Sequence, residues 1–363
     1  MSIAHAEIRD LCPRALSGHR RQTIRETLAR LGHSPLADLP RDVYGEGAAM
    51  QALECDVAAL LGYPAAVFMP KGVIAQQAAL RIWTERSGFK TVGLHPKSHI
   101  DFDERGAYER LHGLQAVRLG LDHQPFGRAE LEAAAEEFGV VTVELPLRRA
   151  GFKLPDWDEL VAISDWCRAR GVPLHFDGAR LWEAQPHYAR PLTEIAGLAD
   201  STYVSFYKGL GGLGGSILAG PADFIAAARV WQGRHGGNLW TAFPFVISAA
   251  EGLRHYLPRM PAYRVRARAL AAALARIPGV RAVPAPPPTN AFQVYLPVSL
   301  KALDAAHLEL ARNSGVWLFG RFAETVLPDL TMAEITIGDA AEDLSDGEIV
   351  ELVDRLVAAA QSR

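Results

Sequence analysis

Cysteine and lysine are both scarce in this sequence. Three cysteines among 363 residues are too few and too scattered for a disulfide framework or a zinc site, at Cys12, Cys55 and Cys167. His95 and His99 would have metal-ligand spacing only on a helix, and Pro96 between them argues against one, so no metal site is expected. Only six of the 38 basic residues are lysines, and the other 32 are arginines. A lysine in a loop of unusual composition therefore stands out.

The sequence also lacks the features of membrane and nucleic-acid proteins. No apolar run reaches the roughly 18 residues of a membrane span. Glu7, Arg9 and Asp10 lie where a secretory signal would have its apolar core. The net charge of −3 gives no electrostatic reason to expect nucleic acid or an anionic membrane as a partner. We expect a cytoplasmic protein, in which the basic run 14–30 is the solvated face of a helix.

Length and composition are ordinary for a globular protein of two domains, with 49% apolar and 22% charged residues. Short apolar strands alternate with helices from about residue 65 to 220, which predicts an α/β domain with a mostly parallel sheet covered by helices. From about residue 258 the pattern becomes that of a small α+β domain. We expect an N-terminal lead and helix over 1–40, a large domain over 41–257 and a small domain over 258–363.

The stretch 205–215 carries the first chemical signal. An apolar strand over 203–206 ends just before Lys208, and five of the next seven residues are glycines. Such glycines let backbone N–H groups approach a bound group closely. A lysine, unlike an arginine, can act as a neutral amine that attacks an aldehyde to form a Schiff base. The alternative is an ordinary lysine beside a mobile turn.

A second stretch, 172–180, favours the chemical interpretation. A short apolar strand ends on Asp177, at the rim where parallel sheets place their ligands, and Gly, Ala and Arg180 follow. Pyridoxal phosphate (PLP) needs an imine-forming lysine and a carboxylate that keeps its pyridine nitrogen protonated. Lys208 and Asp177 are candidates for that pair. Asp177 would also suit a helix N-cap, but the nearby lysine loop favours the cofactor.

A strand, turn and helix around residue 70 form an anion-binding pattern. The strand 65–69 is followed by a turn and by a helix that begins near residue 74. The start of a helix offers free N–H groups and the positive end of the helix dipole. For PLP the phosphate would be held by the N–H groups of Gly72 and Val73, with the Lys71 ammonium nearby.

Four separated motifs occur in one order from about residue 42 to 255. They are Tyr44-Gly45-Glu46, Ser98-His99-Ile100, the His-Phe-Asp-Gly-Ala-Arg run over 175–180, and the Lys208 loop. In this order and approximate spacing the chain resembles the threonine aldolase (β-eliminating lyase) family of PLP enzymes, which have the aspartate-aminotransferase fold, fold type I.

The resemblance implies catalytic roles for Lys208, Asp177 and His99, and a binding role for Arg180. Lys208 matches the lysine that carries the cofactor, and Asp177 matches its pyridinium partner. His99 matches the histidine that stacks on the cofactor ring and is a candidate for proton transfer. Arg180 matches the arginine that reaches the substrate carboxylate and the phenolic oxygen of the cofactor.

The resemblance also implies binding roles. Gly72 and Val73 match the phosphate site, beside Lys71, and Ser205 is a further candidate for a phosphate contact. Tyr44 matches a tyrosine near the active site that is often shared between subunits. A homodimer or homotetramer with shared active sites is therefore implied.

The chain departs from the family pattern at four places. Lys71-Gly72-Val73 replaces Ser-Gly-Thr, Leu145-Pro146-Leu147 replaces Asn-Thr-His, Phe206-Tyr207 replaces Leu-Ser, and Glu334 stands where a second carboxylate-binding arginine is expected. Arg148 or Arg149 would compensate for that arginine. These changes leave the cofactor machinery intact and leave the substrate open.

The activity that the resemblance implies is PLP-dependent cleavage of the Cα–Cβ bond of a β-hydroxy-α-amino acid, giving glycine and an aldehyde. Within PLP chemistry the alternatives are β-elimination, racemisation, transaldol transfer and transamination. A non-catalytic relative that kept the fold is an alternative of a different class.

Overall fold

The computed structural model describes residues 3–363, which form two compact units. One unit comprises residues 24–258, and the other joins residues 3–23 to 259–363. The predicted division into 1–40, 41–257 and 258–363 stays a prediction. Its first two residues lie outside the described part of the chain.

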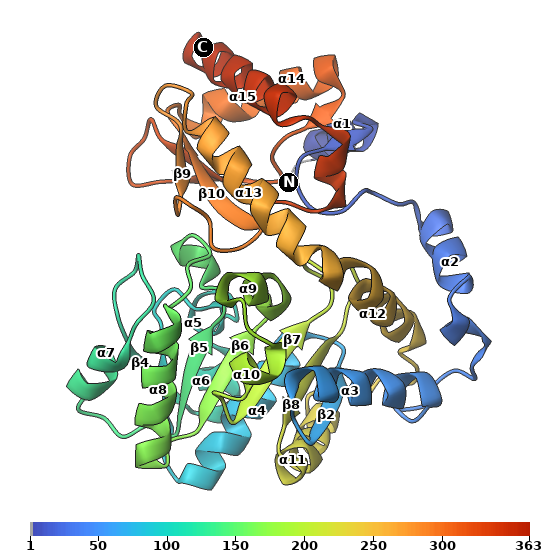
Figure 1. Ribbon diagram of the computed structural model, residues 1–363, viewed down its shortest axis with the longest axis vertical. Coiled ribbons are helices and arrows are strands. Elements are labelled where there is room, and N and C mark those ends of the chain that lie inside the picture. Colours follow the sequence, from blue (N-terminus) through green and yellow to red (C-terminus); the bar gives the residue numbers. More distant parts are fainter. Residues whose placement is uncertain (1–2) are drawn as a thin grey trace. The chain divides into compact units, whose positions relative to one another are not determined.

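A seven-stranded sheet forms the centre of the unit 24–258 (Figure 1). The strand order is β2-β8-β7-β6-β5-β3-β4, with β8 antiparallel to both neighbours and every other pair parallel. The predicted mostly parallel sheet is thus confirmed. The strands are Ala65–Met69 (β2), Thr91–Leu94 (β3), Gln115–Arg118 (β4), Val140–Glu144 (β5), Leu174–Gly178 (β6), Ser201–Ser205 (β7) and Ser216–Gly220 (β8).

Helices flank this sheet, as the alternating pattern predicts. Strands β6, β7 and β8 are buried along their whole length because they are covered on both faces. The helices are Ile24–Gly32 (α2), Pro35–Asp38 (η1), Ala48–Leu61 (α3), Gly72–Ser87 (α4), His99–Phe102 (α5), Ala107–His112 (α6), Arg128–Ala133 (α7), Arg148–Ala150 (η2), Trp157–Arg170 (α8), Leu181–Tyr188 (α9), Leu192–Ala196 (α10), Ala222–Arg234 (α11), Phe243–Tyr256 (α12) and Leu257–Arg259 (η3).

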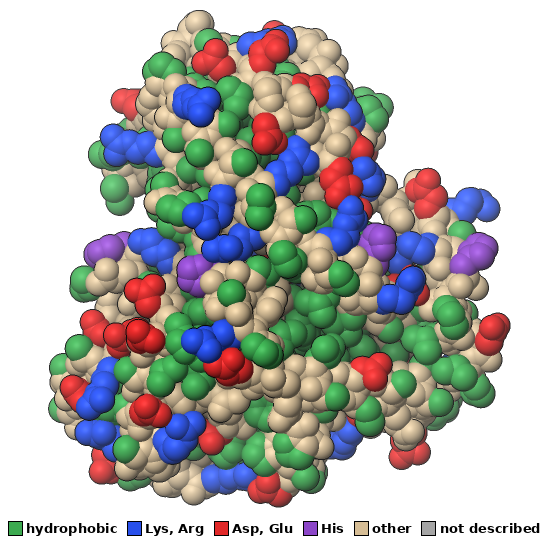
Figure 2. Space-filling model, in the orientation of Figure 1, with side chains coloured by type: hydrophobic (Ala, Val, Ile, Leu, Met, Phe, Trp, Pro, Cys, Tyr) green, Lys and Arg blue, Asp and Glu red, His purple; other side chains and the backbone are tan. Residues whose placement is uncertain are grey.

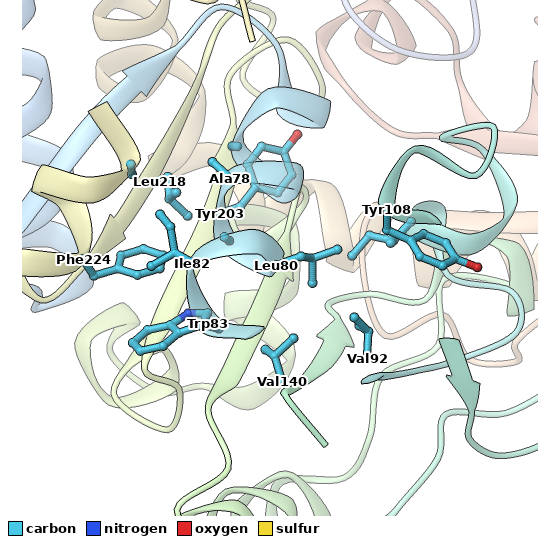
Figure 3. Packing of buried hydrophobic residues seen from close by; sticks show 14 of the residues in the cluster. Ala78, Leu80, Ile82, Trp83, Val92, Tyr108, Val140, Tyr203, Leu218 and Phe224 are labelled. Atoms are coloured by element: carbon cyan, nitrogen blue, oxygen red, sulfur yellow. The ribbon is translucent and has the colours of Figure 1, made fainter. Parts of the chain in front are cut away.

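Helix α4 packs its apolar side chains into the main core of this unit (Figure 3). Leu80 is fully buried in a cluster with Val140 and Leu218 from the sheet. Trp83 stacks on Phe224 of α11, with ring centroids 4.6 Å apart. Burying each side chain of this size contributes about 1.5–3 kcal/mol. This packing fixes the start of α4 relative to the carboxyl ends of the strands.

The second unit is built on a four-stranded antiparallel sheet in the order β12-β13-β10-β9. A short parallel pair joins β1 near the N-terminus to β11. The elements are Ile3–Leu11 (α1), Arg14–Ala15 (β1), Met260–Leu274 (α13), Arg281–Val283 (β9), Ala291–Leu296 (β10), Leu300–Ser314 (α14), Val316–Trp317 (β11), Phe322–Glu324 (β12), Thr331–Thr336 (β13), Asp339–Asp343 (η4) and Asp346–Gln361 (α15).

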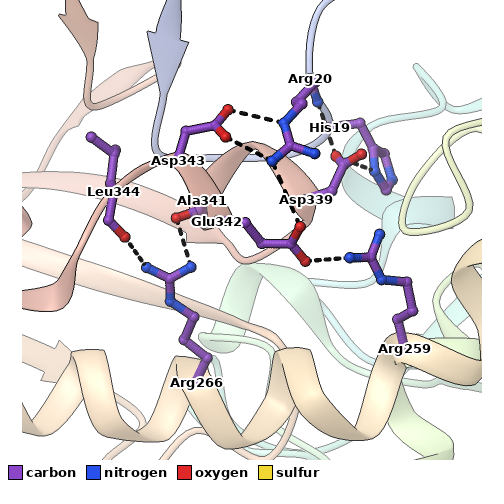
Figure 4. Close-up of polar contacts among 9 residues, drawn as sticks. All are labelled: His19, Arg20, Arg259, Arg266, Asp339, Ala341, Glu342, Asp343 and Leu344. Carbon is purple, nitrogen blue, oxygen red and sulfur yellow. Dashed lines mark hydrogen bonds and ion pairs between the residues drawn. The ribbon is translucent and has the colours of Figure 1, made fainter.

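Ion pairs tie the N-terminal segment to η4 within this unit (Figure 4). His19 Nδ1 lies 3.1 Å from Asp339 Oδ1. The Arg20 guanidinium donates to both carboxylate oxygens of Asp343, at 2.9 and 2.7 Å. Such bidentate pairs fix geometry as well as charge. Residues 3–23 therefore fold with the C-terminal part of the chain rather than with the residues that follow them.

Two local elements differ from the sequence expectation. The expected irregular lead contains helix α1, which packs Ile8 and Cys12 against Ala311 and Trp317 of the same unit. The helix expected over 129–138 ends at Ala133, because Ala134 is extended and the chain turns toward β5. Both depend on contacts far along the chain, which local sequence patterns do not contain.

Among residues 3–363, no helix is long and apolar enough to cross a membrane. On the face shown in Figure 2, basic and acidic side chains are interspersed. This distribution agrees with the small net charge of the sequence.

Candidate active site

The candidate residues meet at the carboxyl edge of the seven-stranded sheet. Glu144 ends β5, Asp177 lies near the end of β6, and Lys208 follows β7 by three residues. Neighbouring parallel strands bring their carboxyl ends to one edge, where α/β proteins bind ligands. One cavity at this edge is lined by His99, Asp103, Glu144, Leu145, Pro146, Arg148, Arg149, Asp177, Ala179, Arg180 and Lys208. Four predicted site residues, His99, Asp177, Arg180 and Lys208, are thus brought together.

The enclosed part of this cavity is small, about 10 Å³. That volume is close to the space occupied by one water molecule. A ligand with the size of a pyridine ring must therefore extend beyond the enclosed part. The chemistry of the lining residues, rather than the enclosed volume, makes this the candidate active site.

Two glycines of the lysine loop are required by close contacts. Gly209 N donates to Glu183 Oε1 at 2.9 Å, and a Cβ at Gly209 would lie 2.4 Å from that oxygen. Gly212 N donates to Phe206 O at 2.8 Å, and a Cβ there would lie 2.9 Å from the same carbonyl oxygen. The loop is thus folded tightly back on the strand that precedes it. The glycines place Lys208 instead of leaving it in a mobile turn.

The environment of Lys208 favours its neutral form. Burial and the positive charge of Arg180 lower the pKa of Lys208 to about 8, although the negative charge of Asp177 opposes this shift. A larger fraction of the amine is therefore unprotonated near neutral pH than for an exposed lysine. Only the unprotonated amine can attack a carbonyl carbon.

Asp177 is buried at the end of β6, with 2% of its surface exposed. Its Oδ1 accepts a hydrogen bond from Ala179 N at 3.2 Å. The helix that follows has Arg180, not Asp177, as its N-cap residue. Asp177 is therefore not a helix cap, which was the alternative reading of this motif.

His99 is held at the cavity by two acidic residues. Its backbone N–H donates to Glu144 Oε2 at 2.7 Å, and its Nδ1 lies 3.1 Å from Glu104 Oε1. Gln77 donates to the other oxygen of Glu104 at 2.7 Å. Burial alone would lower the pKa of His99, but the hydrogen bond with Glu104 and the charge of Asp177 outweigh burial and raise it.

Glu144 connects two loops of the site. One carboxylate oxygen accepts the His99 N–H, and the other accepts the N–H of Arg148 at 3.1 Å. Burial and the nearby charge of Asp177 raise the pKa of Glu144 to about 7. Sequence reasoning assigned no role to Glu104 or Glu144. Glu144 had a detectable signal, since it ends an apolar strand in the same way as Asp177.

Three arginines line the cavity. Arg149 forms an ion pair with Asp103 and lies over the Phe102 ring, with its guanidinium carbon 3.8 Å from the centroid. The Arg180 guanidinium carbon lies 5.4 Å from the Phe152 centroid. Arg149 is therefore engaged by a carboxylate within the site, and Arg148 and Arg180 line the same cavity.

The start of α4 has the backbone of an anion site. No acceptor in residues 3–363 receives the N–H groups of Gly72 and Val73, as is general for the first turn of a helix. A Cβ on Gly72 would lie 2.0 Å from the Tyr203 hydroxyl, so only glycine fits. The Tyr203 hydroxyl lies 3.4 Å from that of Tyr207, which precedes Lys208. Figure 3 shows Tyr203 beside α4. The α4 terminus is thereby linked to the lysine loop.

Other predicted residues do not line the cavity that holds Lys208. Lys71 is exposed at the N-cap of α4. Ser205 is buried and donates its hydroxyl to Ala179 O at 2.7 Å. Tyr44 is 55% exposed and packs edge to face on Trp240, with ring centroids 5.0 Å apart. The roles assigned to these residues stay predictions.

The comparison with known families decides the relationship. The model of the beta-eliminating lyase family matches residues 36–298, which is more than half of the chain. The chain belongs to this family. The predicted family, with PLP fold type I, is thereby confirmed.

Individual relatives agree with this assignment. An uncharacterised Caenorhabditis elegans protein is 30% identical over 243 residues, which are 63% of this chain and 57% of that protein. Low-specificity L-threonine aldolase 1 of Arabidopsis thaliana is 25% identical over 266 residues, 70% of this chain and 74% of the plant protein. A Listeria monocytogenes crystal structure, provisionally named an L-allo-threonine aldolase, has 34% identity and a TM-score of 0.91, covering 98% of this chain and 99% of that one. The family and these relatives support a PLP-dependent lyase that acts on β-hydroxy amino acids.

Proposed function

We propose that this protein cleaves the Cα–Cβ bond of a β-hydroxy-α-amino acid with PLP as cofactor, giving glycine and an aldehyde. The observation that carries the proposal is the placement of Lys208 and Asp177 on one cavity at the carboxyl edge of the sheet. The family model and the threonine aldolases among the relatives support the same reaction. The L-allo isomer of threonine is the first substrate to test, because of the name given to the Listeria structure.

The residues present fit the cofactor. An amine with a lowered pKa, a buried carboxylate and free helix N–H groups behind a required glycine are the three features that PLP needs from a protein. Lys208 would hold the aldehyde carbon, Asp177 the pyridine nitrogen, and Gly72 and Val73 the phosphate, with Lys71 and Ser205 as further candidates. When bound, PLP supplies the electron sink for the breaking bond.

His99 is the proposed base for the β-hydroxyl proton. Its Nδ1 is engaged by Glu104, so Nε2 is the nitrogen available to a substrate. The hydrogen bond with Glu104 and the charge of Asp177 raise the pKa of His99, which favours its acceptance of a proton. Glu144 keeps His99 in place through the backbone N–H.

The substrate carboxylate is assigned to Arg180. Arg148 is the second candidate, because it lines the same cavity and its backbone is held by Glu144. Arg149 is already paired with Asp103. Glu334 lies on β13 opposite Gln293 of β10, in the other unit. A negative charge at this position makes it unsuitable for the carboxylate contact that the family pattern places there.

We further propose a cytoplasmic homodimer or homotetramer in which Tyr44 reaches the active site of a neighbouring subunit. Tyr44 is exposed and does not line the cavity of its own chain, which supports this assignment. Size-exclusion chromatography with light scattering tests the assembly. A monomer that retains full activity would contradict the shared site.

Product analysis tests the proposed reaction. Purified protein with PLP is incubated with L-threonine, L-allo-threonine, phenylserine, serine and alanine, and aldehyde, glycine, keto acids and racemised amino acid are quantified. Aldehyde and glycine in equal amounts support the proposal. Keto acid or racemised amino acid without aldehyde would identify one of the other PLP reactions instead. Absence of any product, with no PLP bound, would indicate a non-catalytic relative.

A further inference from the structure

A second cavity lies within the unit formed by residues 3–23 and 259–363. Its volume is about 780 Å³, and none of its lining residues belongs to the candidate active site. Pockets that bind small molecules typically measure about 300–1,000 Å³. The first turns of α14, the segment from β11 to β12 and His5 of α1 form its walls. The cavity is therefore large enough for a ligand and has no part in the proposed reaction.

The floor of this cavity is aromatic. The ring of His307 contacts Trp317 and Phe322 edge to face, with centroids 4.6 and 5.3 Å apart. Phe319 lies 5.6 Å from Phe322. Burial lowers the pKa of His307 to about 4, so its ring is neutral at physiological pH. A further aromatic ring can pack against such a cluster in the same offset or edge-to-face geometry.

The rim carries charges of both signs. Lys301, Arg321 and Glu324 are exposed, and no ion pair within the described residues involves any of them. Asp304 differs, because both of its carboxylate oxygens contact His5 Nε2, at 2.8 and 3.0 Å. The charges left to meet a ligand are therefore two cations and one anion.

The register of the small sheet places Glu324 on the same face as the floor. Phe322 pairs with Ala333, and Glu324 pairs with Thr331. Burial alternates along β13. Thr331 and Ala333 belong to its buried side chains, and Glu334 belongs to the half-buried side chains on the other face. Side chains that alternate along a strand point to opposite faces. The cavity and Glu334 thus lie on opposite faces of this sheet.

We propose that this cavity binds a free aromatic α-amino acid. Its ring would lie against Phe319 and Phe322, its carboxylate would meet Arg321 and Lys301, and its ammonium would meet Glu324. A simple anion would bring its charge close to that of Glu324. A simple aromatic hydrocarbon would use none of the three rim charges. A zwitterion with a ring matches both the aromatic floor and the charges of the rim.

The test is calorimetric titration of the full-length protein with L-phenylalanine. The holoenzyme is first treated with borohydride, which reduces an imine at Lys208 and closes that site to amino acids. Loss of the visible absorbance confirms the reduction. If no such absorbance exists, the proposed PLP function fails, and the titration is carried out on the untreated protein. The two proposals can therefore fail separately.

One binding site per chain is expected, and each ligand group has its own control probe. 3-Phenylpropionate lacks the ammonium, 2-phenylethylamine lacks the carboxylate, and L-alanine lacks the ring. Each is expected to bind at least about tenfold more weakly than L-phenylalanine, the factor that corresponds to about 1.4 kcal/mol. Equal binding of 3-phenylpropionate would overturn the assignment of a zwitterion.

Variants locate the site. Arg321→Gln and Glu324→Gln are each expected to weaken binding by about five- to tenfold, since the first removes a contact to the carboxylate and the second removes the contact to the ammonium. Arg312→Gln on α14 is the matched control, because Arg312 is exposed and does not line the cavity. A circular dichroism spectrum verifies that each variant is folded. Absence of binding to the wild-type protein, or equal affinities of Arg321→Gln and Arg312→Gln, would overturn the proposal.

Discussion

Glu144 and Asp177 stand opposite one another on adjacent parallel strands, in register, at the edge of the sheet that holds Lys208. Two carboxyl groups so close together do not ionise independently. The pKa of Glu144 is raised to about 7 by burial and by the charge of Asp177. Below that pH Glu144 is largely neutral. The two similar residues have different tasks, because Glu144 holds the backbone N–H groups of His99 and Arg148, whereas the charge of Asp177 acts on the lysine amine.

This relationship predicts a pH-dependent effect of Glu144→Gln on stability. A carboxyl group whose pKa rises on folding, here from 4.5 to about 7, binds more protons in the folded state between these pH values. Wild-type stability therefore falls as the pH rises through this window. The variant lacks this titrating group. The free energy of unfolding of the variant, relative to that of wild type, should therefore rise by about 1–3 kcal/mol between pH 5 and pH 8. Urea unfolding at both pH values measures the difference.

The loss of a hydrogen bond in Glu144→Gln does not depend on pH, so only the change between pH 5 and pH 8 tests the argument. Glu136→Gln is the control, since Glu136 is exposed. A stability difference between Glu144→Gln and wild type that stays constant over this pH range would contradict the raised pKa.

Glu104→Gln should lower the pKa of His99. The substitution removes the negative charge beside Nδ1 but retains a side chain that can contact Gln77. Burial then dominates, and the pKa of His99 is expected to fall. The titration of the His99 ring by NMR measures this shift, and the acidic limb of the aldol-cleavage rate should move by the same amount. An unchanged titration curve would show that Glu104 does not control His99.

Gly72→Ala should weaken both folding and PLP binding. The added Cβ would lie 2.0 Å from the Tyr203 hydroxyl, in a densely packed part of the core. Overpacking of this kind costs about 1–3 kcal/mol, and the displaced helix start would no longer present its N–H groups correctly. Gly32→Ala is the control, because a Cβ there meets no atom within 4 Å. Thermal unfolding and PLP titration are the measurements. Equal behaviour of the two variants would rule out the close contact.

Much of the fold and part of the site could be predicted from the sequence. The apolar strands before Asp177 and Lys208, and their order along a parallel sheet, are local patterns that place both residues at one edge. The glycine loop indicated close backbone contacts, and Gly209 and Gly212 have them. These features depend on short stretches of chain and on general rules of α/β folds.

The remaining features depend on contacts between distant segments. Glu104 supports His99 only because α4 brings Gln77 to its other oxygen. Helix α1 is stabilised by residues near 311–317. Tyr203 reaches the start of α4 from a strand more than a hundred residues later in the chain. No local periodicity contains such information.

The absorbance spectrum of the purified protein with PLP, compared between wild type and Lys208→Ala, tests the central claim most directly. Lys90→Ala is the matched control, since Lys90 is exposed and lies away from the cavity. Wild type and Lys90→Ala should show the visible band of a lysine imine, whereas Lys208→Ala should lack that band and lose aldol cleavage by about 1,000-fold or more. A Lys208→Ala protein that keeps the wild-type spectrum would contradict the account.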